Sequence, residues 1–235
     1  TAKKKTHPLK TIKILCRNKY FILITLAFAV IYTSLGLTGG SRIYYAKYVL
    51  GDEMLNSTMT MFNYIPTILT IMLIPVFTKR FGKIKALFVG FLFYAAGLVL
   101  EIAGPVNLPM IYTGLLLQGI GHAALYSCLF AIVGDVVDYS EWKDGIREEG
   151  ITYSVTSFGQ KIGTGLGTAA LGWILAAGHY DGTAAVQSAS AIFAIKGLFL
   201  YLPLVITVIV LIIWYLFMGI DKIYPTVRKE LDERR

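Results

Sequence analysis

The chain has 235 residues, of which 56% are hydrophobic and only 15% are charged. Soluble domains carry about 25% charged residues, so this composition excludes an ordinary soluble domain and predicts an integral membrane protein. The formal net charge of +8 does not indicate nucleic-acid binding, because the basic residues flank apolar segments and form no separate basic domain.

Six membrane-spanning helices are predicted from long apolar runs with few or no charged residues, because a helix needs about 20 apolar residues to cross a bilayer. In chain order they cover about 20–45, 57–78, 86–104, 109–134, 150–176 and 191–220. A basic tail, 1–19, precedes this bundle of 20–220, and a second tail, 221–235, follows it. Within the second tail, residues 228–235 could form a short solvated helix.

The basic residues indicate how the bundle lies in the membrane. Seven lie in the first tail, four between the second and third spans, two between the fourth and fifth, and five in the last tail. Cytoplasmic loops are enriched in Lys and Arg, so both termini are predicted to be cytoplasmic, in a multi-pass protein of the cell membrane. The two triplets of spans then have opposite topology, as in one half of a major-facilitator transporter with its 3+3 inverted repeat. The predicted fold class is therefore an all-α membrane protein of six transmembrane helices with that architecture.

Glycines recur at a spacing of four residues in two of the spans. Gly159, Gly163 and Gly167 lie in the fifth span, and Gly36 and Gly40 lie in the first. Small residues at this spacing let helix backbones approach closely, so these spans are predicted to pack tightly against neighbours.

Residues 134–150 hold six of the fourteen acidic residues, and within them 135–149 is predicted to form a cytoplasmic loop after the fourth span. Asp135, Asp138 and Glu141 would share one face if this segment were helical. Negative charge at a helix C-terminus opposes the helix dipole, so these carboxylates should have cationic partners. Lys143, Arg147 or residues outside this chain could supply them; a solvated loop with scattered charges is the alternative.

Several segments together resemble one transporter family. The acidic segment, at 135–154, reads DVVDYSEWKDGIREEGITYS, and it is similar to the loop between the tenth and eleventh helices of the glycoside–pentoside–hexuronide:cation symporters. Other segments agree with this resemblance: NKYF at 18–21, YYAKYVLGD at 44–52 and YP…ELDERR at 224–235. The segment TKRFGKIK at 78–85 resembles the short basic loop between the second and third helices of a major-facilitator half. The resemblance covers essentially the whole chain and maps onto the carboxy-terminal half of such a symporter, helices seven to twelve.

A lysine in the middle of the fifth span needs an explanation, because a charge at the bilayer centre costs about 2.5–3.5 kcal/mol. The resemblance implies that Lys161 lies at a sugar and cation cavity between the two halves. It also implies roles in that cavity for Thr156 and Ser157 beside it, and for Tyr126 as an aromatic residue of the sugar pocket. A structural ion pair with another helix is the alternative for Lys161.

Polar stripes along two spans indicate the same cavity. On the fifth span, Ser157 and Lys161 (or Gln160) continue a stripe that Tyr153, Thr164 and Thr168 complete. On the fourth span, Gln118, His122 and Tyr126 recur every four residues. Lipid cannot satisfy such side chains, so they are predicted to face a cavity or a partner. Helix packing remains the alternative for His122 and Tyr126, and for Asn63 and Thr67 on the second span. Glu101 is expected at the outer membrane interface.

The resemblance implies secondary active transport of a sugar or glycoside, coupled to a cation by alternating access, and no enzymatic activity. The expected partners are that substrate, a coupling Na⁺ or H⁺, the lipid bilayer and a missing amino-terminal six-helix half, which would bind most of the coupling cation. No metal or other cofactor is expected. Ion pairs across the halves would close the cytoplasmic side, and the residues assigned to them are Asp135, Asp138, Glu141 and Arg147.

Two other kinds of protein remain open as alternatives. One is a self-associating six-span half-transporter, or a membrane partner protein without independent coupled transport. The other is an intramembrane enzyme that holds Mg²⁺ on its acidic loop. The enzyme is disfavoured because Asp135 and Asp138 supply only two ligands, without a His/Asp cluster beside them.

Overall fold

The computed structural model describes residues 15–145 and 147–234, and all their regular structure is helical. Most of the predicted tail 1–19 therefore lies outside the described residues. The helices in chain order are α2 (Lys19–Tyr48), α3 (Leu55–Ile71), α4 (Ile74–Phe81), α5 (Lys83–Ala103), α6 (Leu108–Asp144), α7 (Glu149–Ala177), α8 (Ala189–Lys196), the π-helical turn η1 (Gly197–Tyr201), α9 (Leu202–Phe217) and α10 (Gly219–Glu233).

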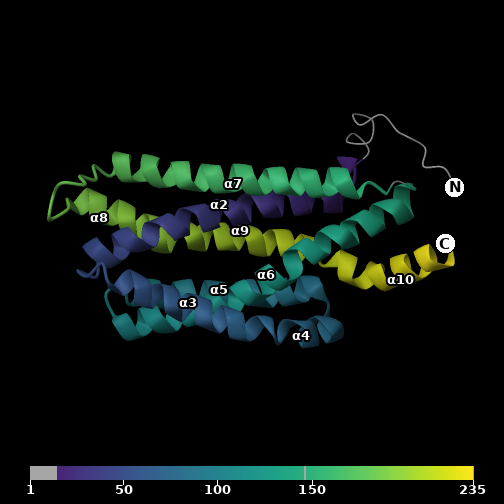
Figure 1. Ribbon diagram of the computed structural model, residues 1–235, viewed down its shortest axis with the longest axis horizontal. Coiled ribbons are helices and arrows are strands. Elements are labelled where there is room, and N and C mark those ends of the chain that lie inside the picture. The colour runs from purple at the N-terminus through teal and green to yellow at the C-terminus, as the bar shows by residue number, and fades with distance from the viewer. Residues whose placement is uncertain (1–14, 146, 235) are drawn as a thin grey trace.

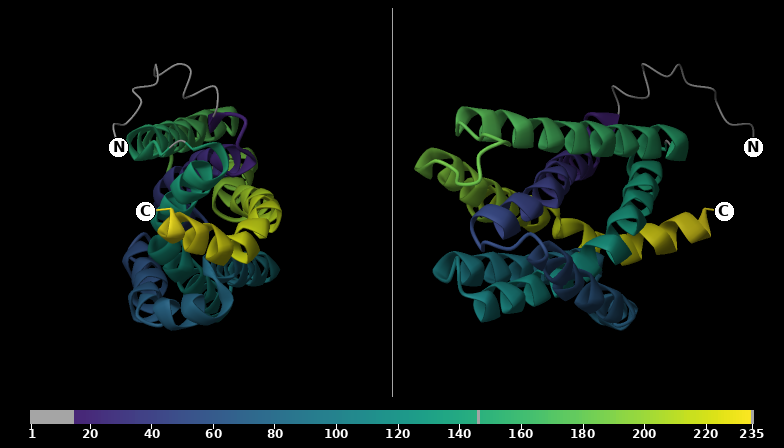
Figure 2. Two further views of the ribbon diagram at one scale, coloured as in Figure 1. Left: turned by 90° about the vertical axis from the view of Figure 1, so that its right-hand side faces the viewer. Right: turned by 60° about the vertical axis from the view of Figure 1, so that its left-hand side comes forward.

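The long helices lie side by side along one axis of the molecule (Figure 1). The most extensive contacts join α2 with α7, α5 with α6, and α3 with α6, while α9 packs against both α5 and α2. At one end α10 extends beyond the bundle, where α6 ends and α7 begins, as Figure 1 and the right-hand view of Figure 2 show. Large buried side chains fill the space between α2, α5, α6 and α9, among them Phe28, Leu87, Ile132 and Trp214.

Within the described residues, four helical stretches are long and apolar enough to cross a membrane: Lys19–Tyr48, Lys83–Ala103, Leu108–Asp144 and Ala189–Glu233. A fifth is obtained if α3 and α4 are taken together, because they form a pair bent by 55° at a short break. Pro75, in the first turn of α4, explains this break, because proline cannot continue the hydrogen-bond ladder of a preceding helix. By the same test α7 is not among the spans, so the sixth predicted span is not established by length and composition.

The predicted loop over 135–149 is wrong, because α6 continues through Asp144 before the chain turns. Gly145 ends it in the left-handed conformation (φ 66°) that favours glycine. Asp135, Asp138 and Glu141, which suggested a loop, lie on this helix and form ion pairs with Lys83 and Arg147. The final tail is also more ordered than expected: α10 covers most of it and buries Ile220, Val227 and Leu231.

The close approach predicted from the glycines is confirmed where α7 packs on α2. A Cβ atom at Gly163 would collide with the carbonyl oxygen of Ala29, and one at Gly167 with that of Thr33. On the other helix, a Cβ at Gly36 would lie 2.7 Å from the carbonyl oxygen of Thr164. The two backbones therefore touch along a strip that only small residues allow.

Candidate functional site

A polar cavity of about 220 Å³ lies between α2, α3 and α6. Most of its lining consists of side chains that can donate or accept hydrogen bonds, with a cation and two tyrosines among them. The lining residues are Leu35, Thr38, Gly39, Arg42, Asn56, Thr60, Asn63, Tyr64, His122 and Tyr126.

Arg42 provides the positive charge of this cavity. Its Nη1 donates a hydrogen bond to Thr60 Oγ1 at 3.1 Å, and the Thr60 hydroxyl in turn donates to the carbonyl oxygen of Asn56 at 2.7 Å. The Nε atom of Arg42 is buried without a hydrogen-bond partner. Arg42 was not among the site residues predicted from the sequence, because it stands at the end of the apolar run of the first span. In the structure α2 continues past it to Tyr48.

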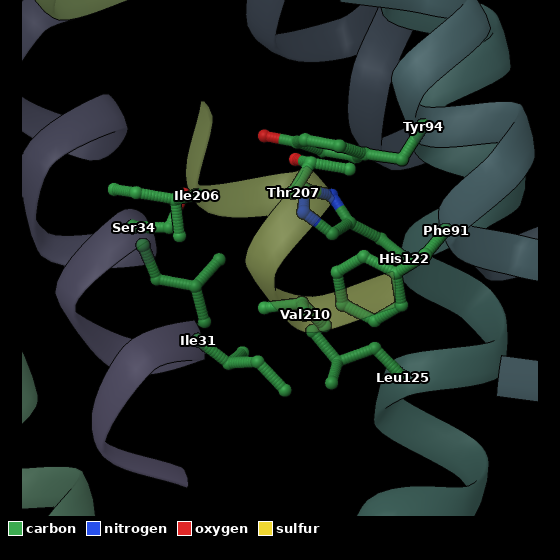
Figure 3. A pocket seen from close by; sticks show the side chains of 10 residues that line it. Ile31, Ser34, Phe91, Tyr94, His122, Leu125, Ile206, Thr207 and Val210 are labelled. Carbon is green, nitrogen blue, oxygen red and sulfur yellow. The ribbon is translucent and has the colours of Figure 1, made fainter. Parts of the chain in front are cut away.

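His122 and Tyr126 both line the polar cavity, as their spacing on α6 predicts. Tyr126 is 45% exposed, and its ring centroid lies 5.8 Å from that of His122. His122 also borders a second cavity of only about 10 Å³, which has room for no more than a water molecule. Figure 3 shows His122 and Tyr94 reaching toward Thr207 of α9 at this smaller cavity. His122 therefore lies where the polar cavity meets the packed interior.

The polar stripe of α7 lies on a different face from its glycines, as predicted. Lys161 is exposed, as are Tyr153, Thr164 and Thr168, whereas Ser157 and Gln160 are half-buried. Within the described residues Lys161 makes no ion pair, and it does not line the polar cavity. The structure thus leaves the α7 stripe at the surface of this chain, outside the cavity that His122 and Tyr126 of α6 line.

Thr156 lies outside this stripe. Its side chain is fully buried, and its hydroxyl donates to the carbonyl oxygens of Thr152 and Tyr153 on its own helix, at 3.1 and 3.0 Å. A substrate cannot reach the Thr156 side chain in this conformation, so Thr156 is not part of the candidate site.

Three other polar residues join helices inside the bundle. Glu101, expected at the outer membrane interface, lies in the last turn of α5; it is fully buried between helices and accepts a hydrogen bond from Gln118 Nε2 at 2.7 Å. Asn63 and Thr67 of α3 donate to backbone carbonyl oxygens of α6 at 3.2 and 2.9 Å. Because α3 and α6 form two walls of the polar cavity, these bonds also fix its width.

A cluster of ion pairs, here called the end cluster, lies where α6 ends; it consists of Lys83, Asp135, Asp138, Glu141 and Arg147. Lys83 Nζ lies 2.6 Å from Asp135 Oδ1 and joins α5 to α6. Arg147 Nη1 lies 2.8 Å from Asp138 Oδ1 and 2.6 Å from Glu141 Oε2. The hydrogen bond with Glu141 raises the pKa of the Arg147 guanidinium above its ordinary value, so this cation stays charged.

The end cluster bears out the single acidic face and one of its two predicted partners. Arg147 pairs as expected, but Lys143 lies over the ring of Tyr139, 5.8 Å from its centroid. The partner of Asp135 is instead Lys83, from the basic segment after the second span. Every one of these ion pairs forms within this chain.

Helix α10 is attached to the same end of the bundle. Tyr224 donates a hydrogen bond to Asp138 Oδ2 at 2.9 Å, and Trp142 Nε1 donates to Glu230 Oε2 at 2.7 Å. Asp221 accepts from the backbone N–H groups of Ile84 and Lys85 at the start of α5, where a carboxylate is favoured. The carboxy-terminal helix is thus part of the folded unit.

Residues 1–222 match the model of a protein family described as "MFS/sugar transport protein". The chain belongs to this family, as the resemblance of its acidic segment predicted. The family and the several long apolar helices support a multi-pass membrane protein, and membership of a transporter family gives no support to the alternative of an intramembrane enzyme.

Curated relatives of the chain have names that fit this family. It is 31% identical to the isoprimeverose transporter of Lactiplantibacillus pentosus, over 98% of this chain and 48% of the relative. It is 27% identical to the glucuronide carrier protein homolog of Escherichia coli (strain K12), over 97% of this chain and 49% of the relative. It is 25% identical to the uncharacterized symporter YjmB of Bacillus subtilis (strain 168), over 95% and 49%. The chain spans about half the length of these relatives.

Proposed function

We propose that this chain is the carboxy-terminal six-helix half of a permease that transports a sugar or glycoside, coupled to a cation, by alternating access. The observation that carries the proposal is the polar cavity between α2, α3 and α6 in a chain of this family. Asn56 and Thr60 offer the hydrogen bonds that sugar hydroxyls need, and Tyr126 offers an aromatic face for the apolar side of the ring.

The helix contacts support a 3+3 inverted repeat with six spans. Let α2, α3–α4 and α5 form one triplet, and α6, α7 and α8–α9 the other. Exchanging the triplets turns the α2–α7 contact into the α6–α3 contact, and the α5–α6 contact into the α9–α2 contact. The α5–α9 contact maps onto itself. In this arrangement α7 is the fifth span, and its glycine face packs on α2.

The exposed stripe of α7 also fits a half of a larger transporter. Lys161 on a lipid-facing surface would be costly, so we propose that this stripe faces the amino-terminal half and lines the same central pathway as the polar cavity. Lys161, Gln160 and Ser157 would then approach the substrate from one side, and His122 and Tyr126 from another. The coupling Na⁺ or H⁺ would be bound mainly by the other half.

The end cluster has a proposed role in closing the pathway. We place it on the cytoplasmic side, together with both termini, because basic residues gather there. Its carboxylates already have partners in this chain, so we propose that it makes α5, α6 and α10 one rigid unit. Arg147, whose side chain is 33% exposed, would exchange partners with the other half when the cytoplasmic side closes.

The test is glycoside uptake by the full-length gene product that contains this chain, reconstituted in liposomes under an imposed Na⁺ or pH gradient. We expect uptake to rise with one of the two gradients, and Lys161→Ala or Tyr126→Ala to lower it more than tenfold. Lys222→Ala is the matched control, because Lys222 is an exposed lysine on α10. Uptake that is unchanged by either gradient would contradict cation coupling. Absence of uptake would contradict the proposed function, and wild-type uptake by both Lys161→Ala and Tyr126→Ala would contradict the proposed site.

A further inference from the structure

Among the described residues that line the polar cavity, Arg42 has a buried side-chain nitrogen without a hydrogen-bond partner. A guanidinium has five N–H donors, but within the described residues its side chain makes a single hydrogen bond, to Thr60. Its Nε atom is shielded from solvent and has no partner. The charge is thus partly desolvated and points donors into a cavity.

The described part of the chain offers no counter-ion to this arginine. None of its carboxylates lies within 4.0 Å of the Arg42 nitrogen atoms. Glu101 is the buried acid of the same region and is near enough to interact electrostatically with Arg42, but it makes no ion pair with it. One Glu101 oxygen accepts a hydrogen bond from Gln118 of α6, and the other has no hydrogen-bond partner among the described residues. Burying an unpaired charge is unfavourable, so an arginine kept in this position calls for an anion from outside the described residues.

We propose that the cavity binds a polyhydroxylated substrate that carries an oxyanion, and that Arg42 contacts this oxyanion. This inference rests on the proposed transport function and specifies its substrate class. The planar fork of a guanidinium matches the oxygen pair of a carboxylate, and the two terminal nitrogen atoms of Arg42 can supply such a fork. Thr38, Asn56 and Tyr64 line the same cavity. Their side chains are uncharged and polar, so they can form hydrogen bonds with the hydroxyl groups of the substrate.

The alternative source of negative charge is a carboxylate from the rest of the transporter. In that case Arg42 would be neutralised before the substrate arrives, and a charged substrate would gain nothing over a neutral one. The two possibilities therefore predict different selectivity for substrates that differ only in charge.

The test compares matched ligands on the purified full-length gene product in lipid nanodiscs, by isothermal titration calorimetry. One pair is methyl β-D-glucuronide and methyl β-D-glucoside, which differ only in a carboxylate or a hydroxymethyl group at C6; the corresponding galactose derivatives form a second pair. We expect the wild-type protein to bind one uronide at least tenfold more tightly than its neutral partner. Arg42→Gln should lower the affinity for the uronide at least tenfold and leave the affinity for the neutral glycoside within twofold.

Two variants keep this result interpretable. Arg42→Lys retains the charge without the fork and should keep part of the preference for the uronide. Lys47→Gln removes a cation from the exposed side of the same helix, where Lys47 pairs with Glu53 at 3.4 Å, and should change neither affinity. Melting temperatures of all variants show whether a loss of binding is a loss of folding.

The outcomes separate this inference from the proposed function. Equal binding of charged and neutral ligands by the wild-type protein would overturn the oxyanion assignment and leave sugar transport standing. A preference for the uronide that survives in Arg42→Gln would also overturn it. Failure of the wild-type protein to bind any member of either pair would overturn both.

Discussion

The polar cavity and the end cluster both contain basic side chains that are partly removed from water, but they satisfy them differently. In the end cluster, Lys83 and Arg147 each meet carboxylates of the same chain at 2.6 Å. In the cavity, Arg42 meets only a neutral hydroxyl. A charge that finds its partners within the fold stabilises the fold, whereas a charge left without one is available to a ligand. This difference supports a structural role for the end cluster and the proposed ligand-binding role for the polar cavity.

The largest effect on stability is expected from the end cluster, at Asp135. The carboxylate is 9% exposed and accepts two hydrogen bonds from Lys83. Asp135→Asn removes the negative charge and leaves Lys83, whose side chain is 34% exposed, without its partner. We expect a loss of about 2 kcal/mol in the free energy of unfolding, measured as a lower melting temperature of the full-length protein.

Asp144→Asn is the control for this variant, because Asp144 is an exposed carboxylate on the same helix. Its effect should stay within about 0.5 kcal/mol. Equal shifts for the two variants would mean that the Lys83–Asp135 pair does not stabilise the fold.

A smaller effect is expected where α10 joins the end cluster. Tyr224→Phe removes the hydroxyl that donates to Asp138, while Arg147 continues to pair with that carboxylate. We expect a loss of about 1 kcal/mol, visible both as a lower melting temperature and as faster proteolysis of the carboxy-terminal helix. Tyr215→Phe is the matched control, since Tyr215 is 66% exposed. If α10 becomes no more accessible to protease, Tyr224 does not attach it.

Much of the helical architecture was predictable because long apolar runs and glycine spacing are local properties of the sequence. The end of α6 was not, because Asp135 and Asp138 look like loop residues until Lys83, 52 positions earlier, is brought beside the first of them. A contact between distant segments thus neutralises an acidic residue in the part of α6 that was expected to be a loop, whereas the helix itself ends at Gly145.

The candidate site was predictable in part for the same reason. The spacing of His122 and Tyr126 on α6 placed both on a polar face, and both line the cavity. Arg42 lies at the end of the predicted first span and was not among the predicted site residues. Only the packing of α3, which brings Thr60 to it, shows that it belongs to the cavity.

The smallest expected effect on the free energy of unfolding is that of Arg42→Leu, and its sign distinguishes the polar cavity from the end cluster. Arg42→Leu removes the unpaired charge and leaves no group orphaned, because Thr60 still donates to the carbonyl of Asn56. Replacing a buried charge with an apolar side chain of similar size is commonly neutral or stabilising. We therefore expect the melting temperature of the ligand-free protein to correspond to a gain of up to about 1 kcal/mol, opposite in sign to that of Asp135→Asn. A binding residue that destabilises its own fold fits a trade of stability for function. A marked loss of stability in Arg42→Leu would instead show that Arg42 has a partner in the complete protein, and the contrast between the two regions would disappear.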